Sequence, residues 1–297
     1  MPETGKIIIA GGNGFLGKAL VKEIINEAEI VLHPNRFEFD LLNKDSIKHY
    51  LQQYHAEKIK LVIAAACTPY SVTPADQPEK MMENSTMIEN LVEVISEYNI
   101  NPERIIYLST IDVYKETNET ITEDAAKEPE TYYGAAKLAA ESFLEVYATK
   151  KNVPVALLRL SQVYGPGDNS PKFIPSVIAS AVKEKRISLH GDGKLYRDFI
   201  YINDVTNIII HFIKTAQPLQ GAFNLSTGHS CSLYEAAMIV KEIIPAAEIE
   251  MSKATDKKPV NYFIANDRLK NIFPFQFTDL ATGLRQTIAA AMHEQII

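Results

Sequence analysis

Apolar residues in this chain form two patterns, short continuous runs and longer segments with helical spacing. Short apolar runs are typical of buried strands, and they predict strands at 7–10, 29–32, 37–41, 61–66, 105–108, 155–160 and 222–225. Residues three or four positions apart predict helices that begin near residue 15, at Asn84, at Phe173, after Asp204, at 233–244 and near residue 280. Because strands alternate with helices, the pattern predicts an α/β fold, a doubly wound parallel sheet.

Three glycines stand between the first predicted strand and the first predicted helix. Gly11, Gly14 and Gly17 have the spacing G-x-x-G-x-x-G. In a strand–turn–helix unit, the first glycine allows a tight turn and the second lets the backbone approach a pyrophosphate. The third lets the helix pack close to the strand, with its N-terminus facing the anion. The stretch therefore predicts a dinucleotide-binding unit, although a plain turn has the same glycines.

The loop after the second predicted strand suggests which dinucleotide is bound. NAD-binding folds usually place an acidic residue there to hold the ribose 2′-hydroxyl, whereas this chain has His33, Asn35 and Arg36. A neutral or cationic loop suits a 2′-phosphate better, so NADP is favoured over NAD; the alternative is that Arg36 is a solvated loop charge. Asp40 could accept from an adenine amino group or cap the next helix. The small residues Ala64 to Ala66 suit a cofactor that lies across the end of their strand.

A tyrosine and a lysine lie four residues apart in the segment that carries the predicted chemistry. Tyr133 and Lys137 share one face of a helix at this spacing, and an ammonium beside a phenol lowers the pKa of the phenol. Tyr133 could then exchange a proton with a sugar hydroxyl or carbonyl, while Lys137 could hold nicotinamide ribose hydroxyls. An isolated match of this kind can also be a surface pair, but here Thr110 ends the preceding strand.

The motifs together resemble the extended short-chain dehydrogenases/reductases of the NAD-dependent epimerase/dehydratase family. The resemblance covers nearly the whole chain. Its motifs are the three glycines, Asn84 and Asn90, 108–114, Tyr133 with Lys137, 159–167, 191–193, 197–205 and 224–228. It implies a Rossmann domain at 1–164 and 201–228, and a smaller discontinuous substrate domain at 165–200 and 229–297.

The resemblance also implies the site residues. The catalytic residues would be Thr110, Tyr133 and Lys137. Thr110 would hydrogen-bond the reacting sugar oxygen, and Tyr133 would transfer the proton. The cofactor would contact Gly11, Asn13, Gly14, Phe15, Leu16, Gly17, His33, Arg36, Asp40, Leu41, Ala64, Ala65, Ala66, Asn84, Tyr133 and Lys137. The substrate would contact Thr68, Thr110, Asp112, Asn169, Lys172 and Arg197. Arg197 is the best candidate for a substrate diphosphate, because guanidinium binds phosphate oxygens bidentately; the alternative is an ion pair with Asp198 or Asp204.

The implied activity is hydride transfer with NAD(P) at a nucleotide-linked sugar, and C4 is the expected position. We favour a 4-ketoreductase and keep a 4-epimerase as the alternative, since both use the same three residues. Family 4,6-dehydratases carry an acid pair directly after the catalytic threonine, where this chain has Ile111 and Asp112; dehydration is therefore disfavoured. A non-catalytic NADP-binding regulator would have no need of Thr110, Tyr133 and Lys137 together.

Composition narrows the expected partners. The net charge of −7 gives no reason to expect nucleic acid, and no apolar stretch is long enough to predict a membrane span. The first strand follows no basic and apolar leader, so a cytoplasmic location is expected. Cys67 and Cys231 are expected to be buried thiols, with no metal site. By the resemblance, we expect a homodimer formed through the helices that begin near Asn84 and Tyr133. Its seam would draw on the following residues, although some of them must face the sheet: Met87, Leu91, Val94, Leu138, Phe143 and Val146.

Overall fold

The computed structural model describes residues 5–25, 30–55, 57–71, 75–252 and 260–293. Its contacts divide the chain into two compact units. The first comprises 1–115, 126–160 and 206–223, and the second comprises 116–125, 161–205 and 224–297. The domain boundaries expected from the sequence lie close to these, except that 116–125 falls in the second unit.

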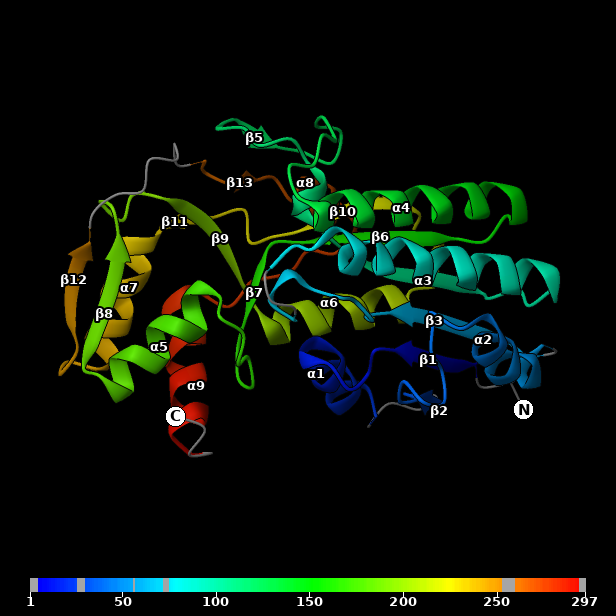
Figure 1. The fold of residues 1–297 in the computed structure, drawn as a ribbon, viewed down its shortest axis with the longest axis horizontal. Coiled ribbons are helices and arrows are strands. Elements are labelled where there is room, and N and C mark those ends of the chain that lie inside the picture. Colours follow the sequence, from blue (N-terminus) through cyan, green and yellow to red (C-terminus); the bar gives the residue numbers. More distant parts are fainter. Residues whose placement is uncertain (1–4, 26–29, 56, 72–74, 253–259, 294–297) are drawn as a thin grey trace. The chain divides into compact units, whose positions relative to one another are not determined.

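A six-stranded sheet organises the first unit (Figure 1). Its strands, in spatial order, are β10 (Gly221–Leu225), β6 (Val155–Leu160), β4 (Arg104–Thr110), β3 (Ile59–Ile63), β1 (Lys6–Ala10) and β2 (Ile30–Leu32). The pairs from β6 to β2 are all parallel, with Ile8 opposite Leu61 on one side and Leu32 on the other. The predicted doubly wound α/β class is confirmed. The order reverses between β1 and β3, which is where such sheets bind ligands at their carboxyl ends.

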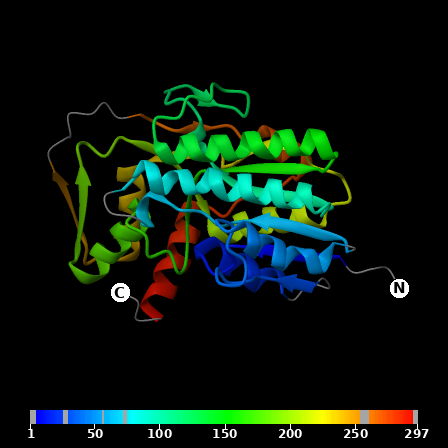
Figure 2. The same ribbon diagram turned by 45° about the vertical axis from the view of Figure 1, so that its right-hand side comes forward.

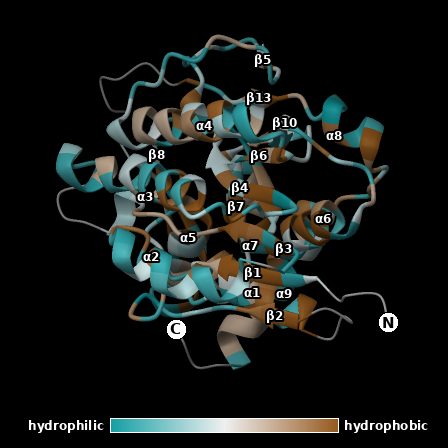
Figure 3. Ribbon diagram, turned by 90° about the vertical axis from the view of Figure 1, so that its right-hand side faces the viewer, coloured by the Kyte–Doolittle hydropathy of each residue, from teal (hydrophilic) through white to brown (hydrophobic). Residues whose placement is uncertain are grey.

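Helices cover both faces of this sheet. They are α1 (Phe15–Ile24), α2 (Lys44–Leu51), α3 (Pro78–Glu97), α4 (Tyr132–Lys151) and α6 (Ile202–Lys214). Alternate strand residues such as Ile8, Leu61 and Leu157 join one core cluster with apolar residues of α2, α3 and α4. The residues between them, such as Ile7 and Val62, are buried as well, as expected when both faces of a sheet are covered. Figure 3 shows α2, α3 and α4 on one side of the strands and α6 on the other.

The strand predicted at 37–41 is wrong, because this segment forms a turn. The side-chain oxygen of Asn35 accepts from the amides of Phe37 at 2.8 Å and Glu38 at 3.3 Å. The Asn35 carbonyl also accepts from the amides of Glu38 and Phe39. An Asn side chain that bonds its own backbone offers the chain an alternative to a sheet. Phe39 and Leu41 are nevertheless buried in the core, which explains why the segment has the apolar character of a strand.

Other element boundaries also differ from the prediction; α6, for example, begins at Ile202 rather than after Asp204. β3 ends at Ile63, so Ala64 to Ala66 lie beyond the strand, and β4 extends to Thr110. α3 begins at Pro78 rather than at Asn84, since proline is well suited to the first position of a helix. Glu29 of the second predicted strand and residues 72–74 lie outside the described residues.

Three of the residues expected at the dimer interface are buried in the core of the first unit instead. Met87, Leu91 and Val94 are 9%, 1% and 2% exposed and belong to the core. Phe143 and Val146 on α4 are exposed. The two cysteines are half-buried free thiols rather than buried ones.

The second unit is built from small sheets and short helices. Its strands are β5 (Thr120–Ile121), β7 (Gln162–Tyr164), β8 (Arg186–His190), β9 (Tyr196–Tyr201), β11 (Ser230–Ser232), β12 (Glu248–Ser252) and β13 (Phe263–Ile264). They form the sheets β11-β9-β7, β12-β8 and β13-β5. Its helices are α5 (Phe173–Lys183), α7 (Leu233–Ile243), α8 (Asp267–Ile272) and α9 (Leu280–His293). Among the described residues of the whole chain, no helix is both long and apolar enough to cross a bilayer.

Candidate active site

The glycine turn has the close backbone packing that a dinucleotide cradle requires. Gly11 has a φ of 87°, and a Cβ there would overlap the backbone of Ala65. A Cβ at Gly17 would overlap the carbonyl oxygen of Gly11. Gly14 is the N-cap of α1 and carries no side chain that bonds the helix. The turn therefore exposes backbone to a ligand at a helix N-terminus, where the helix dipole favours an anion.

A cavity of about 360 Å³ lies in the second unit, and a larger one of about 540 Å³ lies in the first. The larger cavity is at the carboxyl ends of β1 and β3, where the strand order reverses, and its size is typical of a cofactor site. Its lining includes these predicted cofactor residues: Gly11, Asn13, Gly14, Arg36, Asp40, Leu41, Ala64, Ala65 and Ala66. Phe15, Leu16, Gly17, His33 and Asn84 are not among the residues that line it.

Arg36 and Asp40 form a long ion pair at this cavity. Arg36 Nε lies 3.5 Å from Asp40 Oδ2, and the Arg36 side chain is 70% exposed. Asp40 does not cap the next helix, because the N-cap of α2 is Asn43, whose side chain accepts from Ser46. Asp40 Oδ1 accepts from the Leu42 amide at 3.0 Å instead. Both a cation and a carboxylate thus line this cavity.

The sequence did not predict the cavity residues that α3 supplies. Lys80, Glu83 and Met87 line the cavity, and Lys80 Nζ bonds Glu83 Oε1 at 2.8 Å. Pro78 at the start of α3 was the signal that could have placed Lys80 and Glu83 on a helix. Asn84 supports the wall indirectly: its amide group bonds both the backbone N–H and the carbonyl of Cys67, at 3.0 and 2.8 Å. The remaining unpredicted lining residues are Ala10, Pro34, Phe39, Leu42, Cys67 and Ser71.

The first unit also contains the three predicted catalytic residues. Thr110 ends β4 and is 7% exposed. It is the N-cap of the 3₁₀ turn η3 (Ile111–Val113), and its hydroxyl accepts from the Asp112 amide at 3.2 Å. Tyr133 lies in the first turn of α4, whose N-cap is Thr131. A Cβ at Gly134 would overlap the carbonyl oxygen of Asp112, so the first turn of α4 packs directly on η3.

Lys137 lies one turn after Tyr133 on α4. Its side chain is 1% exposed, and Nζ donates to the Leu108 carbonyl at 2.6 Å and lies 4.0 Å from the centre of the Tyr107 ring. Burial lowers the pKa of Lys137 to about 7, and the nearby Glu141 opposes this shift. Glu141 is itself buried in an ion pair with Arg159, at 3.0 and 2.7 Å.

The pKa of Tyr133 shifts in the direction opposite to the prediction. Burial raises it above the usual range for a phenol, and the Asp112 carboxylate adds to the rise. The predicted lowering by Lys137 is therefore wrong in this structure. The physical reason is that the Lys137 amine is directed to Leu108 and Tyr107, while burial, together with Asp112, raises the pKa of the phenol.

The substrate candidates of the second unit occupy separate positions. Arg197 Nη1 donates to the carbonyls of Tyr196 and Val260, at 2.8 and 2.6 Å, and its guanidinium lies over the Tyr262 ring. Asp198 and Asp204, the suggested ion-pair partners, accept hydrogen bonds from threonines. Thr227 donates to Asp198, as Thr278 does to Asp204.

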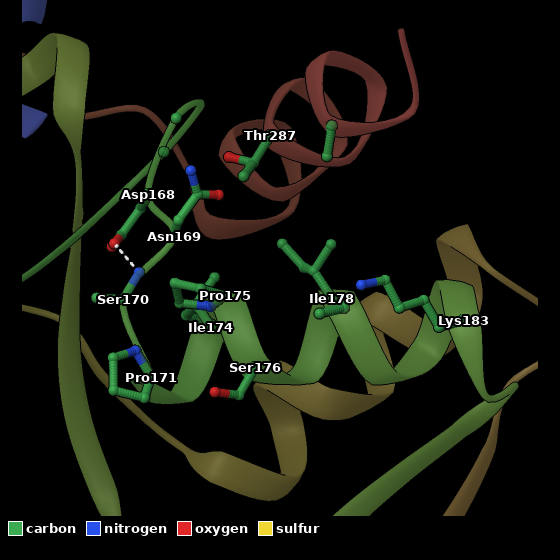
Figure 4. Close-up of a pocket in the computed structure, with 14 residues that line it drawn as sticks. Asp168, Asn169, Ser170, Pro171, Ile174, Pro175, Ser176, Ile178, Lys183 and Thr287 are labelled. Atoms are coloured by element: carbon green, nitrogen blue, oxygen red, sulfur yellow. Dashed lines mark hydrogen bonds between the residues drawn. The ribbon is translucent and has the colours of Figure 1, made fainter. Parts of the chain in front are cut away.

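Asn169 lines the cavity of the second unit, together with the loop around Asp168 and parts of α5 and α9 (Figure 4). Asp168 Oδ1 accepts from the Ser170 amide at 3.0 Å, and Lys183 lines the cavity at the other end of α5. Lys172 is the N-cap of α5 and does not line this cavity. In the first unit, Thr68 lies outside the lining of the larger cavity.

A family model for the NAD dependent epimerase/dehydratase family matches residues 7–226, well over half of the chain. The chain belongs to this family. It is therefore an enzyme of the NAD dependent epimerase/dehydratase family, which confirms the resemblance seen in the sequence. The match ends within the second unit and includes the glycine turn and the three predicted catalytic residues.

Known proteins resemble most of the chain. Human dTDP-D-glucose 4,6-dehydratase is 26% identical over 288 residues, covering 90% of this chain and 80% of the relative. The UDP-glucuronic acid 4-epimerase of Bacillus cereus, solved with UDP-glucuronic acid and NAD, superposes with a TM-score of 0.84 at 23% identity, covering 98% and 100%. RMD from Pseudomonas aeruginosa, solved with NADPH, has a TM-score of 0.84 at 20% identity, covering 98% of each chain. These two structures share the fold of this chain while holding different dinucleotides.

Proposed function

We propose that this enzyme transfers hydride between NADP(H) and C4 of a nucleotide-linked sugar, and that it acts as a 4-ketoreductase. The observation that carries the proposal is the placement of Tyr133 in the first turn of α4, which packs on η3 directly after Thr110 at the end of β4. A phenol that keeps its proton is suited to donate it to an oxygen that becomes a hydroxyl. This is the proton transfer that reduction of a ketone needs.

The residues have separate roles in this proposal. The dinucleotide would be held by the glycine turn and the lining of the larger cavity, and when bound it supplies the hydride. Thr110 would donate a hydrogen bond to the C4 oxygen, and Tyr133 would give its proton to the same oxygen. Lys137 would bond the nicotinamide ribose. Thr68 and Asp112 would contact the sugar.

Recognition of the nucleotide part is assigned to the second unit. We propose Arg197 for the diphosphate, because the carbonyls of Tyr196 and Val260 hold its guanidinium in place. A fixed guanidinium is well suited to bidentate phosphate contacts. Asn169 and Lys172 are proposed as further contacts to the nucleotide sugar.

The charges at the larger cavity support NADP(H). Arg36 and Lys80 both line it, and one charge-assisted hydrogen bond to a phosphate contributes about 1.5–3 kcal/mol. This corresponds to roughly one to two decades in dissociation constant. A dissociable NADP(H) suits a reductase, which must exchange its cofactor in every cycle.

A 4-epimerase is the second candidate, and one observation favours it. Asp40 and Glu83 also line the cavity, so carboxylates are present that could accept from a ribose hydroxyl. An epimerase regenerates its cofactor within each turnover and is expected to retain NAD. The fold likeness to a UDP-glucuronic acid 4-epimerase is compatible with this alternative.

Calorimetric titration of NADPH and NADH tests the cofactor assignment. We expect NADPH to bind at least about tenfold more tightly than NADH, and Arg36→Ala to remove most of the difference. Arg186→Ala is the control, because Arg186 is an exposed cation paired with Glu184 in the second unit. Turnover of nucleotide 4-keto sugars with NADPH, followed by nicotinamide absorbance, tests the reaction. Stoichiometric NAD retained through purification would reject the NADP assignment and favour the epimerase.

A further inference from the structure

A carboxylate from another part of the first unit holds the helix turn that carries Tyr133. Asp76 Oδ1 accepts from the Tyr133 amide at 2.8 Å, and Asp76 Oδ2 accepts from the Tyr132 amide at 3.0 Å. The next amide, that of Gly134, donates to Thr131 Oγ1 at 2.9 Å. The first amides of a helix have no partner within it. Two of these three are bonded by Asp76, which lies more than fifty residues earlier in the chain.

The backbone of Asp76 has an unusual conformation. Its φ is +56°, in the left-handed region that residues other than glycine seldom adopt. Such a conformation persists where the surrounding contacts fix it. Asp76 lies two residues before Pro78, where α3 begins. It therefore links the N-terminal ends of α3 and α4, which run side by side (Figures 1 and 2).

The residues on both sides of Asp76 contact the proposed cofactor site. Ser71 precedes it, and Lys80 and Glu83 follow it; all three line the larger cavity. Asn84 fixes the segment after β3 to α3 through its two bonds to Cys67. Asp76 thus bonds the catalytic helix α4 and is near in sequence to residues that line the cavity.

We propose that Asp76 is a positioning residue for Tyr133, which it serves by fixing the first turn of α4. This inference rests on the proposed role of Tyr133 as the proton donor. The same turn packs on η3, where a Cβ at Gly134 would overlap the Asp112 carbonyl. A turn held on both sides fixes the direction in which the phenol leaves the helix. Loss of the carboxylate lets the turn fray and moves the phenol from the reacting oxygen, and a displacement of about 1 Å can cost a hundredfold in rate.

Two substitutions at Asp76 separate positioning from simple stability. Asp76→Gly removes the carboxylate without strain, because glycine accepts a left-handed backbone. Asp76→Asn keeps one amide-accepting oxygen, and asparagine tolerates the same backbone. The matched control is Asp279→Gly in the second unit, because Asp279 Oδ1 accepts from the Thr282 amide at 2.9 Å in the first turn of α9.

The measurements are kcat and KM with NADPH and a nucleotide 4-keto sugar, and the dissociation constant of NADPH. We expect Asp76→Gly to lower kcat by about 10- to 100-fold. Asp76→Asn should lower kcat by about 3- to 10-fold, since one oxygen must serve two amides. NADPH affinity should stay within about twofold, because Asp76 does not line the larger cavity and its carboxylate accepts from backbone amides of the α4 turn. Asp279→Gly should keep the kcat of the wild type. Hydrogen exchange of the peptide that contains 131–137 should accelerate in Asp76→Gly and stay as in the wild type in Asp279→Gly.

A wild-type kcat in Asp76→Gly would overturn the inference, as would a loss that only follows the folded fraction. If Asp76→Gly does not fold, Asp76→Asn decides the question, and a wild-type kcat in that variant overturns the inference. Full turnover in Tyr133→Phe would instead contradict the proposed function, so the two failures are distinguishable.

Discussion

At the scale of residues, burial controls the charges of the catalytic pair. Lys137 is 1% exposed and its pKa falls to about 7, while burial and Asp112 raise the pKa of Tyr133. Both shifts favour the uncharged form of the side chain, as desolvation always does. The spacing of the two residues could be read from the sequence, but their burial could not. This is why the predicted direction for Tyr133 was wrong.

The first residue-scale prediction concerns proton transfer. Tyr133→Phe should lower kcat by roughly 10²- to 10⁴-fold, the usual contribution of a general acid. The fold and the NADPH affinity should be preserved, since only the hydroxyl is lost. Tyr132→Phe is the matched control, because Tyr132 is the neighbouring residue and is 54% exposed. Steady-state kinetics of the two variants check the expectation, and equal turnover in both would contradict it.

The second residue-scale prediction concerns pH. Burial lowers the pKa of Lys137 to about 7, whereas ribose hydroxyl oxygens favour its protonated form because the ammonium is the stronger donor. Binding should therefore take up a proton when the pH exceeds about 7, and affinity should fall as pH rises from there, by at most about tenfold per pH unit.

Calorimetry between about pH 6 and 9, in two buffers with different ionisation enthalpies, measures this uptake. NADH is the suitable ligand, because a 2′-phosphate would itself titrate near pH 6. Lys137→Met should abolish the proton uptake. A dissociation constant that does not change with pH in the wild type would show that Lys137 does not titrate on binding.

At the scale of elements, two glycines of the turn serve different purposes, one for helix packing and one for ligand approach. The neighbours of Gly17 are the backbone atoms of Gly11 and Gly12, so α1 packs on the turn itself. A Cβ at Gly14 would lie 3.4 Å from the Gly11 oxygen, an ordinary contact. The two positions therefore serve different purposes within one motif.

This difference predicts opposite phenotypes for two alanine variants. Gly17→Ala overpacks the turn, which typically costs about 1–3 kcal/mol and should lower Tm by about 2–10 °C. Gly14→Ala should leave Tm nearly unchanged but weaken NADPH binding, because Gly14 lines the larger cavity, where the dinucleotide is proposed to bind. Thermal unfolding and calorimetric titration of both variants check this pair, and equal losses of Tm would contradict it.

The same scale shows how far the sequence could predict this fold. Local signals placed β1, the glycine turn, α5 and the strand–helix alternation, because each depends on residues that are neighbours in the chain. Hydrogen bonds to the Asn35 side chain stabilise a turn at 37–41, where the sequence predicted a strand. The cavity residues Lys80 and Glu83 were missed because α3 begins six residues earlier than predicted. The carboxylate of Asp76 could not be predicted, since its partners are distant in sequence.

At the scale of the whole molecule, the exposed apolar residues of α4 bear on assembly. Phe143 and Val146 are 40% and 53% exposed, whereas the seam residues expected on α3 are buried in the core. We therefore place the predicted homodimer contact on the outer face of α4. Burial of large apolar side chains is the main favourable contribution to such interfaces, and stable ones cover about 800 Å² on each partner.

The final prediction tests this assembly with charge. Light scattering at micromolar concentration should give twice the mass of one chain for the wild type. The double variant Phe143→Glu, Val146→Glu should give the mass of a monomer, because a two-fold contact would bring like charges from both copies together. Met251→Glu is the control, since Met251 is 48% exposed on β12 in the second unit and should leave the dimer intact. Circular dichroism must show that the double variant is folded. A monomeric wild type would contradict the homodimer, and a dimeric double variant would place the contact on another surface.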